Sequence, residues 1–154
     1  MLTPGLKPPR IERTQLLSMS RRQLIDLYAT SQAGPIPDGP ARGTALVAPG
    51  TPLNGLLAAW TSLVGWQGKT FDAVRGSLVN RVTPLRIDAI AADVYIASSL
   101  LDGEPCIVLD YSKRSTVARF IRDEIRNVAP SLYLGFAYWA EVRLIAFTLD
   151  FRRA

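Results

Sequence analysis

Four charged side chains fall within the five residues RDEIR, at positions 122–126, in an otherwise apolar part of the chain. If this segment is a β-strand, neighbouring side chains point to opposite faces, so Arg122, Glu124 and Arg126 share one row and Asp123 takes the other. On the outside of a sheet, the first row would be a solvated ladder of weak ion pairs, as charged rows usually are. On the inside, Glu124 would stay ionised between two arginines, whose guanidinium groups could bind an anionic or carbonyl ligand. The sequence favours the ladder and leaves the ligand anchor open.

A second candidate group lies in IVLDYS, at positions 107–112, where Asp110 ends an apolar strand and Tyr111 projects to the opposite face. A carboxylate in apolar surroundings has a raised pKa and can act as a general acid or base. The favoured interpretation is structural: Asp110 caps the turn SKRS that follows, or pairs with Lys113 or Arg114.

The segment WQGKTFD carries Trp66 and Lys69 on opposite rows, with Gly68 at a position typical of a bulge or a close backbone approach. Trp66 could line a pocket and Lys69 could reach its mouth, although a core tryptophan and a surface lysine are slightly favoured. Arg86 and Asp88 also share a strand face. Such a pair can orient water for hydrolysis, but it is more often an ion pair near a strand end.

The residue types that the chain lacks exclude several chemistries. It contains no histidine, which removes Ser-His-Asp and Cys-His catalysis, a two-histidine zinc helix and histidine-ligated haem. The single cysteine, Cys106, can form neither an internal disulfide nor a thiolate zinc site, and we expect it to be a small buried hydrophobe. We therefore expect no metal site and no cofactor of the protein's own, and any chemistry must come from Asp, Glu, Tyr, Lys, Arg, Ser or Thr, or from a bound cofactor.

Composition and charge narrow the partners and the compartment. With 154 residues, 48% of them hydrophobic and 20% charged, the chain fits one globular domain. The net charge is +5, but the first 22 residues hold five of the 18 basic residues and one of the 13 acidic ones. A near-neutral body argues against nucleic-acid binding. The sequence shows neither a transmembrane segment nor a signal-peptide core, so we expect a cytoplasmic protein, for which a homodimer stays open.

The elements that must position these residues change in type along the chain. Residues 1–16 are basic and Pro-rich and predict a flexible tail, ahead of a single domain over 17–154. Helices are predicted near 20–32, capped by Ser18 or Ser20, and near 52–64.

The remainder is typical of short strands, and the last of them alternates best, with Ile145, Phe147 and Leu149 on one face. The predicted strands cover residues 41–48, 66–72, 77–82, 86–97, 105–111, 118–128, 131–139 and 142–151. Eight short strands in a meander suit a small closed antiparallel barrel with one or two N-terminal helices, and the alternative is an open curved sheet.

The segment WQGKTF resembles a bacterial family named for its GXWXG motif, whose members have Trp-x-Gly-Lys-x-Phe after a similar helix. The resemblance continues loosely over residues 35–151, through PDGPARG, VLDYS and RDEIRNVAPSLYLG. The chain departs from the family at Gly43, which no tryptophan follows, so the naming motif itself is not intact. The resemblance implies a lipocalin-like (calycin-like) barrel and implies no reaction.

Two functions use these residues in different ways. The first is binding of a small apolar or amphipathic molecule (a lipid, terpenoid or polyketide-like compound), with its polar end held by Arg and Glu. The expected ligand-binding residues are Trp66, Lys69, Tyr111, Arg122, Glu124 and Tyr133. The alternative is a cofactor-independent isomerase, cyclase, hydrolase or decarboxylase, with Asp110, Glu124 and Arg122 as catalytic residues beside Tyr111. A third hypothesis is a pure interaction module in which residues 1–16 become ordered on a partner or an anionic membrane surface.

Overall fold

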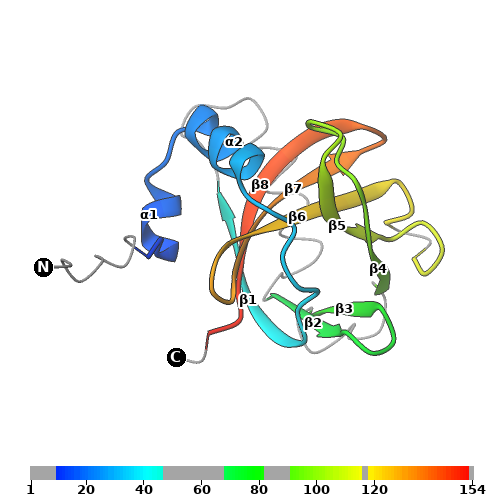
Figure 1. Cartoon of the computed structure of the whole chain (residues 1–154). Helices are drawn as coiled ribbons and strands as arrows, with labels where there is room; N and C mark the ends of the chain where they lie inside the picture. The colour runs from blue at the N-terminus through cyan, green and yellow to red at the C-terminus, as the bar shows by residue number, and fades with distance from the viewer. Residues whose placement is uncertain (1–9, 47–67, 82–90, 116–117, 153–154) are drawn as a thin grey trace, which may run out of the picture.

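The eight strands close into an antiparallel barrel in which every strand pairs with its neighbour in sequence and β1 pairs with β8 (Figure 1). The computed structural model describes residues 10–46, 68–81, 91–115 and 118–152. The strands are β1 (Gly39–Leu46), β2 (Gly68–Asp72), β3 (Ser77–Arg81), β4 (Ala91–Ser98), β5 (Pro105–Asp110), β6 (Ile121–Ala129), β7 (Leu132–Trp139) and β8 (Val142–Asp150).

The closed barrel confirms the predicted fold class, and the open curved sheet is wrong. Gly43 of β1 is paired with Leu149 of β8, while Ala41 of β1 is paired with Lys69 of β2, so neither edge is left unpaired. The predicted helix near 52–64, together with Trp66, Arg86 and Asp88, lies outside the described residues.

Two layers of apolar side chains lie on the two sides of the barrel wall. The inner layer draws buried residues from all eight strands, and only the interior of a closed barrel can collect side chains from every strand. The outer layer combines alternate residues of β5 and β7, together with Ala129 of β6 and Ala146 of β8, with Leu16, Leu24 and Tyr28 of the two helices. The wall is therefore buried on both faces where the helices cover it, and a charged residue on its outer row need not reach water.

The two helices lie on one side of the barrel, across the outer face (Figure 1). Helix α2 (Arg21–Thr30) falls within the range predicted for the first helix, and Ser20 caps it by accepting a hydrogen bond from the Gln23 amide. Helix α1 (Arg13–Leu17) overlaps the stretch expected to be a flexible tail. The tail prediction missed the reciprocal bonds between Glu12 and Gln15 at the start of α1, and the burial of Leu16 in the outer layer.

The segment that joins α2 to β1 lies against the end of the barrel where β1 begins and β6 ends. Its backbone bridges to Asn127 through Gln32, and Pro35 O accepts a hydrogen bond of 2.7 Å from the Tyr133 hydroxyl. Ala33 and Ile36 pack against the inner layer. These contacts cover one end of the barrel with the chain's own residues.

Candidate functional site

A buried polar cluster stands inside the barrel, made by Lys69 of β2, Tyr111 just after β5, and Asp123 of β6. Asp123 lies between Ile121 and Ile125, which both belong to the inner layer, so alternation turns its side chain into the interior. Lys69 and Asp123 are each 1% exposed and Tyr111 is 2% exposed. We call these three residues the interior cluster.

The three groups of the interior cluster meet at one carboxylate oxygen. Lys69 Nζ lies 3.1 Å from Asp123 Oδ2, and the Tyr111 hydroxyl donates to the same oxygen at 3.0 Å. Lys69 Nζ also donates to the Tyr111 hydroxyl oxygen. In a ring of eight strands β2 and β6 are opposite each other, so the ion pair between Lys69 and Asp123 crosses the interior from wall to wall.

Apolar and aromatic neighbours surround the lysine. Its ammonium nitrogen lies 5.1 Å from the ring centre of Tyr111 and 5.8 Å from that of Phe147. Phe147 has room because β7 carries Gly135 opposite it: a Cβ at position 135 would lie 2.5 Å from Phe147 Cζ and 2.7 Å from Ile125 Cγ2. A glycine in the wall therefore admits the ring that packs beside the lysine.

Burial and charge act in opposite directions on Lys69. Removal from water lowers the pKa of its amine, and the nearby Asp123 carboxylate opposes that shift without cancelling it, so the pKa stays below its ordinary value. The other oxygen of Asp123, Oδ1, is buried and has no hydrogen-bond partner among the described residues. A buried acceptor without a donor costs free energy, of the order of 1–3 kcal/mol, unless something supplies the donor. The interior cluster thus combines an amine, a phenol and one vacant carboxylate oxygen.

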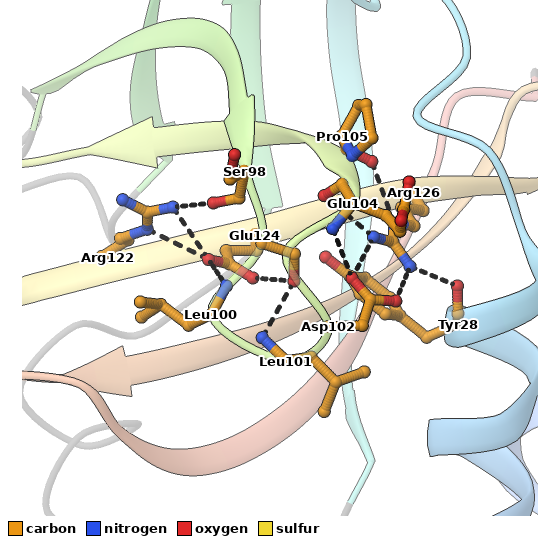
Figure 2. A network of polar contacts seen from close by, with 11 residues as sticks. Tyr28, Ser98, Leu100, Leu101, Asp102, Glu104, Pro105, Arg122, Glu124 and Arg126 are labelled. Atoms are coloured by element: carbon orange, nitrogen blue, oxygen red, sulfur yellow. Dashed lines mark hydrogen bonds and ion pairs between the residues drawn. The ribbon is translucent and has the colours of Figure 1, made fainter.

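The row of Arg122, Glu124 and Arg126 lies on the outer side of the barrel wall. It is not the interior ligand anchor that the sequence left open. It is not the solvated ladder that the sequence favours either, because other parts of the chain cover it. Glu124 is fully buried and accepts bonds from Ser99 Oγ at 2.7 Å, Leu100 N at 2.8 Å and Arg122 Nε at 3.1 Å (Figure 2). The chain that links β4 to β5 folds over this carboxylate. Arg122 and Glu124 therefore cannot hold the polar end of a ligand inside the barrel, and that expectation is corrected.

Arg126 ties three elements together outside the barrel (Figure 2). Its guanidinium binds Asp102 through two bonds of 2.7 Å, and it also donates to the backbone oxygens of Tyr28, Glu104 and Pro105. The Tyr28 ring lies 4.4 Å from the guanidinium carbon. The hydrogen bonds from Arg126 hold the pKa of Asp102 below its usual range. This network joins α2 and the β4–β5 turn to β6.

Asp110 takes the capping role that the sequence favours. It accepts a 2.9 Å bond from Ser112 N and a 2.8 Å bond from the Tyr95 hydroxyl, while Arg114 pairs with Asp93 instead. Burial alone would raise the pKa of Asp110, but the hydrogen bonds from Ser112 and Tyr95 outweigh burial and lower it. The prediction that Asp110 has a raised pKa, as a catalytic acid would, is therefore wrong. Asp110, Arg122 and Glu124 share the outer row, whereas Tyr111, expected beside them, belongs to the inner layer, so the expected catalytic residues do not meet in one cavity.

The structure brings Lys69 and Tyr111 together and adds Asp123, which was not among the expected site residues. Tyr133 also belongs to the inner layer, but its hydroxyl is used by Pro35 O, away from the interior cluster. The preference for a surface lysine at Lys69 is wrong, since that side chain is buried. The sequence did contain an indication of Asp123, because strand alternation placed this carboxylate on the same face as the apolar residues Ile121 and Ile125.

Two features are absent from the ranges that the structure describes. Among these residues, no three Cys, Asp or Glu side chains gather in a way that could hold a metal ion. No helix within them has the length and apolar character needed to cross a bilayer.

Comparison with known proteins supports the fold and gives no activity. No protein-family model and no curated protein matches the chain. A crystal structure of a protein from Thermomonospora curvata superimposes with a TM-score of 0.61 and covers 88% of this chain and 89% of that chain. The two sequences are 17% identical, so the likeness is one of fold alone. The resemblance to the GXWXG-motif family stays a prediction.

Proposed function

We propose that the protein binds a small amphipathic molecule inside the barrel, with the polar end of the molecule at Lys69, Tyr111 and Asp123. An eight-stranded barrel has an interior of the size that side chains fill or that holds one small ligand. The observation that carries the proposal is the vacant Oδ1 of Asp123, a buried acceptor beside two groups already bound to Oδ2. A bound donor would complete the bonding of this carboxylate.

The interior cluster favours a ligand head that donates a hydrogen bond and carries no negative charge. Asp123 Oδ1 can only accept while the carboxylate is ionised, so it suits a hydroxyl or an amide N–H. A ligand carboxylate would bring a second negative charge against Asp123 in surroundings of low dielectric constant. The body of the ligand would lie among the apolar side chains of the inner layer, as expected for a lipid-, terpenoid- or polyketide-like compound.

Calorimetric titration with dodecanol and with dodecanoate tests this proposal. We expect dodecanol to bind the wild-type protein more tightly than dodecanoate, and Asp123→Asn to weaken dodecanol binding by about tenfold, the size of one lost hydrogen bond to a charged group. Asp110→Asn is the matched control, because Asp110 lies on the outer row and its loss should leave the affinity unchanged.

The proposal fails if neither compound binds the wild-type protein, or if both variants bind dodecanol as the wild type does. Tyr111→Phe gives a second reading in case Asp123→Asn folds poorly, since it keeps the ring and removes the hydroxyl that donates to Asp123. Equal dodecanol affinity in Tyr111→Phe and the wild type would place the ligand head away from the interior cluster.

A further inference from the structure

We propose that Lys69 is a nucleophilic amine that condenses with the aldehyde or ketone group of a ligand in the barrel and holds it as an imine. This inference rests on the proposed function, because it places the polar end of the ligand at the same interior cluster. It extends that function from reversible contact to covalent capture and names the class of ligand, an amphipathic hydroxy-aldehyde or hydroxy-ketone, whose hydroxyl donates to Asp123 Oδ1 and whose carbonyl group meets Lys69.

The geometry supplies the groups that imine formation requires. The Lys69 amine is in contact with a phenol, which can deliver a proton, and lies 3.1 Å from a carboxylate, which can stabilise a cation. The Tyr111 hydroxyl is itself bonded to Asp123 Oδ2, so a proton can pass between phenol and carboxylate without water. All three side chains are at least 98% buried, which protects an imine from hydrolysis by bulk solvent.

The proposed reaction balances without an oxidant, a reductant or a cofactor. The neutral amine adds to the carbonyl carbon, the C–N bond forms as the carbonyl π electrons move to oxygen, and one proton passes from nitrogen to that oxygen. Tyr111 then protonates the hydroxyl group, which leaves as water while the nitrogen lone pair closes the C=N bond. The resulting iminium ion is paired with Asp123. Return of its N–H proton to the Tyr111 oxygen gives the neutral imine, so one water molecule is released in all.

Lys69 takes its reactive, neutral form more readily than an ordinary lysine does. Only the neutral amine is nucleophilic, and burial lowers the pKa of Lys69 from its ordinary value against the opposing influence of Asp123. The chain offers a comparison within itself, because it contains three lysines, Lys7, Lys69 and Lys113. Lys113 is exposed to solvent on the turn after β5.

Reductive trapping tests the inference directly. The full-length protein is incubated with dodecanal and sodium cyanoborohydride, which reduces an imine to a stable secondary amine, and the modified peptides are identified by mass spectrometry. We expect Lys69 to be alkylated about tenfold faster than Lys113, because burial favours its neutral amine and the barrel holds the bound aldehyde beside it. Dodecanol, which cannot form an imine, should slow alkylation at Lys69 and leave Lys113 unaffected.

Matched variants separate the roles of the groups. Lys113→Arg should keep the wild-type rate at Lys69, whereas Tyr111→Phe should slow it by removing the proton donor. Lys69→Arg should remove the fast phase altogether. Because the wild-type peptide map already distinguishes the three lysines, the test does not depend on how well Lys69→Arg folds.

The outcomes distinguish the two proposals. If the alkylation rate instead follows solvent exposure, so that Lys113 reacts at least as fast as Lys69, the proposed covalent capture is wrong. If dodecanol binds the wild-type protein while Lys69 is not alkylated, the inference fails and the binding function stands. If dodecanol neither binds nor slows any alkylation, the proposed function itself fails.

Discussion

Asp123 uses its two oxygens in different ways. Oδ2 receives both Lys69 and the Tyr111 hydroxyl, whereas Oδ1 has no donor within the described part of the chain. A buried charge is tolerated only when paired, so Lys69 and Asp123 depend on each other for their burial. The same dependence explains why polar groups can occupy the middle of an apolar barrel and serve a ligand there.

Substitution of Lys69 should show this dependence as a loss of stability. Lys69→Met leaves Asp123 buried without its counter-ion, and we expect the free energy of unfolding to fall by about 3–5 kcal/mol. The double variant Lys69→Met/Asp123→Leu removes both charges and should lose less than the single variant. Urea unfolding of the three proteins measures the difference. An equal loss in the single and double variants would mean that the ion pair does not hold the two charges in place.

Cys106 gives a prediction that depends on pH. Burial raises the pKa of its thiol to about 11, from 9.0 in an unfolded chain, and the nearby Glu124 carboxylate adds to the shift. The folded state therefore keeps the proton longer, so this contribution to stability is complete below pH 9.0 and is lost as the pH rises through about 11.

The free energy of unfolding should thus decline between these two pH values, and Cys106→Ala should reduce the slope. In native protein near neutral pH, Cys106 should react with a thiol reagent far more slowly than in urea, because it is buried and protonated. A pH slope unchanged in Cys106→Ala, together with rapid labelling of the native protein, would contradict this account.

At the scale of elements, β6 joins the barrel interior to the layer outside it. Its inner row provides Asp123, and its outer row provides Glu124 and Arg126, which bind the β4–β5 turn and α2. The charges of RDEIR therefore serve two separate polar networks on opposite sides of one strand. The outer network is structural, since its hydrogen bonds are made within the protein.

Arg126, in the buried network, and Arg114, in a partly exposed ion pair, form a matched pair for testing this role. Arg126→Met removes bonds to Asp102 and to three backbone oxygens, and we expect it to lower the free energy of unfolding by about 3–5 kcal/mol. Arg114→Met, which removes an ion pair with Asp93 between side chains that are 48% and 28% exposed, should cost about 1 kcal/mol. Thermal or urea unfolding compares them, and equal losses would contradict the assignment of Arg126 as the structural anchor.

How far the sequence predicts this protein also depends on the element considered. Strand alternation placed β8 and both rows of β6 correctly, because a strand directs successive side chains to opposite faces whatever surrounds it. It could not decide which row of β6 is inside, since α2 covers the outer row as fully as the barrel covers the inner one. The sequence could not predict the ion pair between Lys69 and Asp123 either, because only closure of the barrel brings β2 opposite β6.

At the scale of the whole molecule, the barrel provides a protected interior with one end covered by its own chain. The α2–β1 connection supplies Ala33 and Ile36 to that end, and Phe151 packs there against Phe71 and Tyr133. The interior cluster lies toward the opposite end, where β2 and β6 begin and β5 ends. The polar groups and the covered end are thus separated along the barrel.

The most direct test of the central claim is the position of a bound ligand relative to the wall of the barrel. Nuclear Overhauser effects between dodecanol and methyl groups of the protein distinguish the two sides, because Ile107, Leu109 and Ile125 face inward while Val108 and Leu134 face outward. We expect contacts from the ligand to the inward methyl groups, with its CH₂OH protons near Ile125. Contacts confined to Val108 and Leu134 would contradict it.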